Sequence, residues 1–352
     1  MASLTAAASG CFVARAGGRA VGSLFSTPRQ VVKTTRPVRP DARLAVVWVG
    51  HATALVQIDD KVILTDPVFT STVGQVSKRV VEPGIDPADL PPVDVALVSH
   101  LHFDHLSLGS LAMIEPKVKT LLLPRGGAAY LTGGFSFPAH EVGTWQAWEK
   151  DGLRVTAVPV DHVGWRYGVD DAWMRDSFTG YVIEYHGLKV YFGGDSAYDQ
   201  RVFVETAQRF PKIDLALLPI APIEPRGIMR RFHMDPAQAV QAFVDLDAAR
   251  MVPIHYDTFI ASTDEPGAAL RELAKAEKKL DLGPRVIAPL AIGERRVFVK
   301  AGEGPELPPE RTFAPAAPPP SPPSAAPAPS EAAPSPSEAA PSPAIPDDDS
   351  FE

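Results

Sequence analysis

Four apolar runs in this chain each end abruptly at a histidine or an aspartate, and this pattern constrains the fold more than any other feature. The runs end at His100, His162, Asp195 and His255, and they begin at residues 93, 155, 189 and 251. An apolar run that stops at polar residues is typical of a buried strand that leads into a loop. We expect helices between these strands, over residues 106–114, 199–209, 236–247 and 266–279. Interleaved strands and helices predict an α/β fold of layered sheets with helices outside, and one edge of its core would gather the polar side chains.

The end of the first run carries a dense group of candidate metal ligands. The sequence SHLHFDH spans residues 99–105 and contains His100, His102, Asp104 and His105. Residues two apart at a strand end lie on the same side, so His100 and His102 can reach one ion. Asp104 and His105 follow after a turn and can face a second ion. Imidazole and carboxylate groups without thiolate suit zinc or another borderline divalent metal, so the pattern predicts a metal site.

Composition divides the chain into one domain and two extensions. The last forty residues hold 13 of the 37 prolines and almost no large apolar residue, so they cannot bury enough apolar surface to fold. The first 43 residues lack sustained periodicity. We therefore predict a basic, mostly disordered leader over 1–43, a single large domain over 44–302, and a disordered tail rich in Pro, Ala and Ser over 303–352. No 18-residue apolar run is present, which excludes a polytopic membrane protein.

The charge distribution excludes one class of partner. The leader carries seven Lys and Arg residues against Asp41, and the last forty residues carry six acidic residues and no basic one. The two extensions therefore cancel, and the central part holds the whole net charge of −8. An acidic domain argues against a nucleic-acid partner, because such binding relies on neutralising phosphates.

The N-terminal residues allow two interpretations of location. Residues 4–11, LTAAASGC, resemble the end of a bacterial lipoprotein signal with Cys11 as the lipidated residue. No Lys or Arg precedes them and the apolar stretch is too short for a signal peptide, so we expect a cytoplasmic or peripheral membrane protein. A membrane-anchored lipoprotein is the alternative if the true start lies upstream, and the basic leader would then lie near anionic head groups.

The motif H-x-H-x-D-H from His100 to His105 resembles the signature of the metallo-β-lactamase superfamily. The later ligands of that superfamily follow in the same order, at His162 (VPVDH), Asp195 (YFGGDSAY) and His255 (MVPIHYDTF). The resemblance covers residues 44–299 and implies a single αββα sandwich domain. It also implies two zinc ions per chain. One would be held by His100, His102, His162 and Asp195, and the other by Asp104, His105, Asp195 and His255.

Further motifs are similar to those of N-acyl-phosphatidylethanolamine-hydrolysing phospholipase D. They are WVGHAT (48–53), LTDPVF (64–69), LPPVD (90–94), PIAPIEPR (219–226) and HMDPAQAV (233–240). This resemblance implies a dinuclear zinc phosphodiesterase that acts on a phospholipid or other phosphodiester and contacts a membrane surface. It places His233 at the substrate phosphate, where the start of a helix would add backbone N–H groups.

Four further residues near these motifs are candidates for the site. Asp104 and His51 are the remaining candidates for a catalytic role, but a buried structural histidine fits the GHAT sequence equally well at His51. Asp66 in LTDP is expected to order the ligand loop without touching metal. Arg166 lies with Trp165, Tyr167 and Trp173 in the loop over 163–177, which can either receive an acyl chain and a head group or simply cover the edge of the sandwich.

Several alternatives remain open at this stage. A lactonase-like hydrolase of a small ester or lactone is a second enzyme hypothesis, because the same hydroxide can attack a carbonyl carbon. A non-enzymatic scaffold that presents the proline-rich tail as an SH3-like ligand is a third. The sequence leaves a homodimer open. His140 and His186 are expected at the surface, and Glu224 and Arg226 suit an ion pair or a substrate contact equally.

Overall fold

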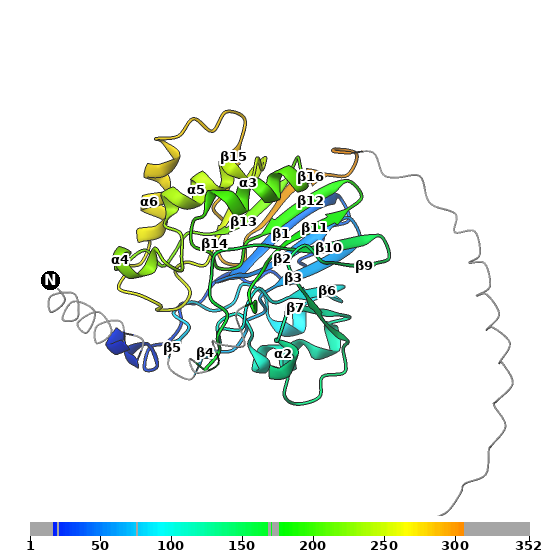
Figure 1. The fold of residues 1–352 in the computed structure, drawn as a ribbon. Coiled ribbons are helices and arrows are strands. Elements are labelled where there is room, and N and C mark those ends of the chain that lie inside the picture. Colours follow the sequence, from blue (N-terminus) through cyan, green and yellow to red (C-terminus); the bar gives the residue numbers. More distant parts are fainter. Residues whose placement is uncertain (1–16, 20, 75–76, 168–169, 171–175, 306–352) are drawn as a thin grey trace, which may run out of the picture. The chain divides into compact units, whose positions relative to one another are not determined.

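The structure, a computed structural model, describes residues 17–19, 21–74, 77–167, 170 and 176–305. Cys11, Trp173 and the predicted tail beyond residue 305 lie outside the described residues. Two sheets of seven strands each form the body of the domain (Figure 1). The strand order is β16-β1-β2-β3-β6-β7-β8 in the first sheet and β15-β14-β13-β12-β11-β10-β9 in the second.

The strands and helices have the following bounds. The first sheet contains β1 (Ala42–Gly50), β2 (Thr53–Ile58), β3 (Lys61–Thr65), β6 (Val95–Leu97), β7 (Leu121–Pro124), β8 (Ala139–Val142) and β16 (Arg295–Lys300). The second contains β9 (Ala147–Lys150), β10 (Leu153–Val158), β11 (Gly180–Tyr185), β12 (Leu188–Phe192), β13 (Leu215–Pro219), β14 (Arg250–Ile254) and β15 (Val286–Ile287). A small hairpin pairs β4 (Thr72–Val73) with β5 (Ser77–Lys78). The helices are α2 (Leu108–Ile114), α3 (Gln200–Arg209), α4 (Arg226–Met229), α5 (Pro236–Asp245) and α6 (Ala268–Glu277), with short 3-10 turns at Pro87–Asp89, Glu115–Lys117 and Ala128–Tyr130.

Burial along β1 explains the layered architecture. All nine residues of this strand are buried, and successive side chains of a strand point to opposite faces. Val46 and Trp48 belong to the core that also contains side chains of the second sheet, whereas Val47 and Val49 pack in a second core together with α2. Helices α3, α5 and α6 cover the other sheet (Figure 1). The predicted αββα sandwich is therefore confirmed.

The predicted helices are present, and their ends agree with the sequence to within two residues. Helix α5 begins as expected from Asp235 and Pro236, because the Asp235 side chain accepts a hydrogen bond from the backbone N–H of Gln238 in a capping box. One predicted strand is shorter than expected. The run over residues 62–69 leaves the sheet after Thr65, since Asp66 adopts a φ of 31° and its carboxylate accepts a hydrogen bond from the backbone N–H of Ser99.

Part of the predicted leader contacts the domain. Arg29 pairs with Val81 in a parallel bridge, and the Lys33 ammonium lies 2.7 Å from Asp86. Residues 29–34 therefore lie along residues 80–86 in an ordered arrangement, because backbone hydrogen bonds and an ion pair replace the apolar periodicity that the leader lacks. The division into leader, domain and tail remains a prediction. Within the described ranges, no helix combines the length and the apolar character needed to cross a membrane.

Candidate metal centre

The structure brings the four strand ends together and places the predicted ligands side by side. His100 follows β6, His162 follows β10, Asp195 follows β12, and His255 directly follows β14. All seven residues predicted as ligands, together with His51, fall into three overlapping groups. In each group, one ligand atom per residue lies within 4.8 Å of the others. The groups are His100, His102 and His162; His51, Asp104, His105 and His255; and His100, His105 and Asp195.

The first group consists of three imidazoles that face one another. His100 Nε2 lies 2.8 Å from His102 Nδ1, and the ring of His162 lies 4.5 Å from that of His100. The Nε2 atoms of His102 and His162 are buried and have no hydrogen-bond partner among the described residues. Buried polar atoms in native proteins are nearly always satisfied. A cation among these rings would satisfy both atoms, so the donor set fits a metal.

The second group combines imidazoles with a carboxylate. His105 Nε2 lies 3.3 Å from His255 Nε2, and an Asp104 oxygen lies 3.6 Å from His105 Nε2. His51 Nε2 lies 2.9 Å from the same Asp104 oxygen. His51 is therefore buried and hydrogen-bonded, as the structural interpretation requires, and it also lines this group. Nitrogen and oxygen donors without sulfur suit zinc or a similar borderline divalent ion.

Asp195 lies between the two groups. One of its oxygens is 3.3 Å from His105 Nε2 and 3.9 Å from His100 Nε2, and the other is 3.1 Å from His255 Nε2. A single carboxylate thus faces histidines of both groups. This placement suits a carboxylate that would be shared by two metal ions.

The second ring nitrogen of several histidines is held by a neighbouring oxygen. His162 Nδ1 lies 2.9 Å from the carbonyl of Phe232, and His255 Nδ1 lies 3.0 Å from the carbonyl of Ala221. His105 Nδ1 lies 2.5 Å from Asp66. Such contacts fix the tautomer that leaves the other nitrogen free for a metal. Asp66 lies behind His105, as expected of a residue that orders the ligand loop.

Burial and the neighbouring charges determine which histidines of the cluster are protonated in the metal-free chain. Burial and the nearby His105 hold the pKa of His100 well below its usual value, and burial lowers the pKa of His51 to about 3. Burial acts in the same direction on His105, but the carboxylates of Asp195 and Asp104 outweigh it and raise the pKa of this residue well above 6.5. A bound divalent ion would displace that proton.

His233 lies beside the ligand cluster, close to Asp195 and His162. Its Nδ1 atom lies 3.6 Å from an Asp195 oxygen, and its ring lies 5.4 Å from that of His162. Burial lowers the pKa of His233 to about 4. At the neighbouring helix start, the Asp235 side chain accepts a hydrogen bond from the backbone N–H of Gln238.

Arg166 has a different environment from the one that a head-group ligand would need. Its side chain is buried, and Nη1 donates to the carbonyls of Leu101 and Leu106 at 2.8 and 2.9 Å. The guanidinium lies 4.3 Å from the Phe103 ring centroid. Arg166 therefore connects the loop after His162 to the ligand loop after β6. Sequence reasoning missed this contact, because nothing in the sequence shows which carbonyls a buried arginine will reach.

The remaining candidates lie outside the two ligand groups. Arg226 pairs with Asp235 at 3.0 Å and donates to the carbonyl of His233, so it holds the His233 loop. His140 is exposed as expected. His186 lies at the surface in the β11–β12 turn, where it is half-buried against Asp59 at 3.1 Å.

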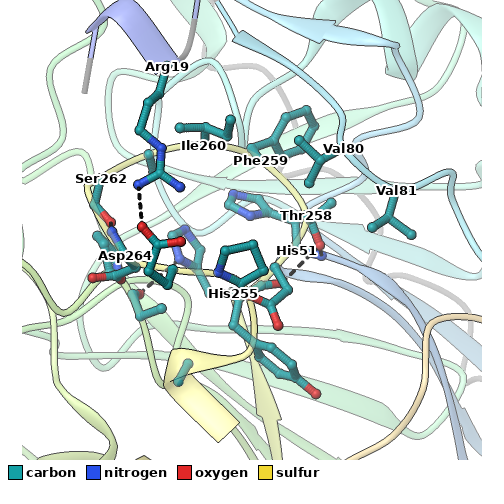
Figure 2. Close-up of a pocket in the computed structure, with 18 of the residues that line it drawn as sticks. Arg19, His51, Val80, Val81, His255, Thr258, Phe259, Ile260, Ser262 and Asp264 are labelled. Atoms are coloured by element: carbon teal, nitrogen blue, oxygen red, sulfur yellow. Dashed lines mark hydrogen bonds and ion pairs between the residues drawn. The ribbon is translucent and has the colours of Figure 1, made fainter. Parts of the chain in front are cut away.

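A cavity opens beside the second group. It has a volume of about 350 Å³, and His51 and His255 form part of its lining. Figure 2 shows these two rings with Phe259 and Ile260 on the walls and Arg19 of the leader projecting toward the cavity. The cavity therefore borders the ligand cluster at these two residues.

Comparison with known proteins places the chain in a known family. Residues 61–256 match the model of a family described as the beta-lactamase superfamily domain. N-acyl-phosphatidylethanolamine-hydrolyzing phospholipase D 1 of Caenorhabditis elegans is 30% identical over 282 residues, which are 72% of this chain and 78% of that protein. The mitochondrial enzyme of the same description from Saccharomyces cerevisiae is 28% identical over 65% of this chain, which spans only 51% of the yeast protein. Isothiocyanate hydrolase from Delia radicum gut bacteria shares the fold with a TM-score of 0.57 at 20% identity, covering 72% of this chain and 98% of that one.

Proposed function

The chain belongs to the beta-lactamase superfamily, and from this premise we propose that it is a dinuclear zinc hydrolase of phospholipase D type. Its substrate would be an N-acyl-phosphatidylethanolamine-like phospholipid. The observation that carries the proposal is the pair of ligand groups on either side of Asp195. The names of the worm and yeast relatives support the lipid substrate.

The residues of the chain divide into two ligand sets around the shared carboxylate. His100, His102 and His162 would hold one ion and Asp104, His105 and His255 the other, with Asp195 common to both. When bound, two such ions supply a water with a pKa near 7 and stabilise the charge that develops on phosphorus. No serine or cysteine nucleophile is then required.

The neighbouring side chains have roles that follow from their contacts. His233 faces the space beside Asp195 and is neutral at pH 7, so its ring N–H can donate to a phosphate oxygen as charge develops there. His51, also neutral, donates from Nε2 to Asp104 and so orients that carboxylate. We place both residues in the catalytic machinery, with His233 on the substrate and His51 behind a ligand.

Exposed aromatic side chains beside the first group support contact with a lipid surface. Trp165 and Tyr167 are 39% and 62% exposed, and the Trp165 ring lies 4.8 Å from that of His102. Phe103 is 36% exposed and lies 5.8 Å from Tyr167. Aromatic side chains with one apolar and one polar end suit a membrane interface.

The proposal is tested with full-length protein loaded with zinc and a panel of three substrates. The panel consists of N-acyl-phosphatidylethanolamine in vesicles, a soluble bis-ester phosphate and an acyl homoserine lactone. We expect two zinc ions per chain and release of N-acylethanolamine, with activity lost in Asp195→Asn and retained in His140→Gln, the exposed control. If the protein hydrolysed only the lactone, the proposed function would be a lactonase and not a phosphodiesterase. A chain that binds zinc and turns over none of the three substrates would refute the proposal.

A further inference from the structure

We propose that the leader forms part of the substrate site, where Arg19 and Arg29 bind an anionic group on the non-reacting arm of the substrate. This inference rests on the proposed function in one respect, which is that the reacting ester group lies at the metal ligands. It concerns the cavity beside the second ligand group. The leader residues involved, 17–19 and 21–34, are called the leader strap below.

The cavity has a reactive end and an apolar middle. His51 and His255 line it next to the ligand cluster, and Val80, Phe259 and Ile260 contribute apolar walls. Its volume of about 350 Å³ lies within the range of roughly 300–1,000 Å³ that is typical of small-molecule sites. Arg19 and Arg29 are the leader residues that line it (Figure 2 shows Arg19).

Other charged side chains that line the cavity are engaged with the protein itself. Both oxygens of Asp264 accept hydrogen bonds from the backbone N–H groups of Ile223 and Glu224. Asp257 accepts a hydrogen bond from the backbone N–H of Gly267. Backbone N–H groups therefore hold these two carboxylates in place, and the third acidic residue of the lining, Glu265, faces Arg19.

The two arginines keep free donors. The Arg29 guanidinium has no hydrogen bond or ion pair with any residue that the structure describes. Arg19 donates from Nη1 to the carbonyl of Thr263 at 2.9 Å and lies 3.6 Å from Glu265, a side chain that is itself 75% exposed. A guanidinium carries five N–H donors in a planar fork, so most remain available to a carboxylate or phosphate.

The leader strap fixes where these arginines lie. The backbone N–H of Arg29 donates to the carbonyl of Val80 at 2.9 Å, and its own carbonyl accepts from the N–H of Glu82 at 3.0 Å. The hydroxyl of Ser23 accepts a hydrogen bond from the backbone N–H of Lys78 at 2.9 Å. The strap is thus hydrogen-bonded at Arg29 to Val80, which lines the cavity, and at Ser23 to Lys78, two residues before Val80.

The order of environments along the cavity defines the chemical class of the ligand. The end of the cavity at His51 and His255 borders the ligand cluster, where the reacting ester would lie. An apolar segment would follow along Phe259 and Ile260, and an acidic group would lie at the arginines. Within the proposed class of phospholipid-like phosphodiesters, the inferred substrate is therefore one that carries a second, remote carboxylate or phosphate. A carboxylate or phosphate can accept two parallel hydrogen bonds from one guanidinium, whereas a neutral amide cannot.

The first test compares two ligands that differ only in the remote group. The mono- and dimethyl esters of nonanedioic acid are titrated calorimetrically into zinc-loaded full-length protein, with bound ligand checked by chromatography for hydrolysis. We expect the monoester, with its free carboxylate, to bind about tenfold more tightly, as two partly exposed charge pairs allow. The double variant Arg19→Gln/Arg29→Gln should remove this preference. Arg36→Gln, a variant of an exposed leader arginine outside the cavity, should retain it.

The second test keeps this inference separate from the proposed function. Two soluble phosphodiesters with a six-carbon arm, ending in a carboxylate or a primary amide, are compared by kcat/KM in the same proteins. Failure to hydrolyse either phosphodiester would count against the proposed function. The calorimetric comparison would still show whether the two arginines of the cavity bind an anionic group. Equal binding of the two nonanedioate esters by wild-type protein would overturn the inference. So would a preference that persists in the double variant, because the carboxylate would then bind the metals.

Discussion

Replacing Asp66 by Asn tests whether the centre depends on the residue behind His105. Asp66 is fully buried, and its two oxygens lie 2.7 Å from the backbone nitrogen of Ser99 and 2.6 Å from the Ser99 hydroxyl. The second oxygen also lies 2.5 Å from His105 Nδ1. An asparagine keeps one oxygen but turns an NH₂ group toward Nδ1. His105 must then lose this hydrogen bond or move its proton to Nε2, the atom that faces the ligand cluster.

The expected loss of zinc affinity follows from the single hydrogen bond between Asp66 and His105. A hydrogen bond to a charged group contributes about 1.5–3 kcal/mol, which corresponds to roughly 10- to 100-fold in a binding constant. Losses of this size are typical when the partner behind a metal-bound histidine is removed. We therefore expect Asp66→Asn to weaken one of two zinc sites by about 10- to 100-fold while the other is unchanged. Activity should recover largely when free zinc is raised.

The assay is competition for zinc against a chromogenic chelator, with thermal unfolding measured on the same samples. Asp94→Asn is the matched control, because Asp94 also accepts a backbone hydrogen bond, from Val62 at 2.9 Å, but lies outside the ligand groups. Wild-type affinity at both sites in Asp66→Asn would show that Asp66 serves packing alone. Loss of both ions from a folded variant would show that Asp66 acts on the whole centre.

Further predictions concern four other changes. Asp195→Ala should abolish activity and reduce bound zinc below two per chain, measured by elemental analysis, since it removes the carboxylate that faces both groups; a full complement of zinc would contradict the ligand assignment. His233→Gln should keep both ions and the fold yet lose about 2–4 kcal/mol of transition-state stabilisation, on the order of 30- to 1,000-fold in kcat/KM; loss of zinc would make His233 a ligand. Arg166→Met should lower the free energy of unfolding by about 2–4 kcal/mol, because two buried carbonyls lose their donor; denaturant titration measures this, and Arg166→Lys should recover part of it. Truncation after Thr312 should leave the melting temperature and turnover of a soluble substrate nearly unchanged, and a large loss in either would show that the tail packs on the domain.

The ends of the ligand-bearing strands were predictable because an apolar run followed by a histidine or aspartate indicates both the buried strand and the residue at its end. The run that ends at His255 is apolar up to the ligand, and the run before His100 is apolar over residues 95–98, so the same residues specify burial and placement. The start of α5 was predictable for a similar reason, since Asp235 and Pro236 satisfy the first turn locally. These features need no knowledge of distant parts of the chain.

Contacts between distant segments were not predictable from such signals. The carbonyls of Phe232 and Ala221 hold two of the ligand histidines, and a backbone oxygen leaves no trace in the sequence. The burial of Arg166 depends on how one loop folds over another. The leader lacks periodicity, so its position along residues 80–86 follows from backbone hydrogen bonds that any sequence without proline at those sites can make.

The convergence of ligands from both sheets has a consequence for the order of folding. His105 and His255 are 150 residues apart in the chain, yet their Nε2 atoms lie 3.3 Å apart. Bringing such distant residues together before the sheets exist would cost loop-closure entropy without compensation. A metal ion held by these residues would therefore not nucleate this domain as zinc nucleates a zinc finger, because it would enter an edge that is already assembled. When bound, such an ion would stabilise the native state by mass action, by about 4.1 kcal/mol per site when the free metal is at 1,000 times its dissociation constant.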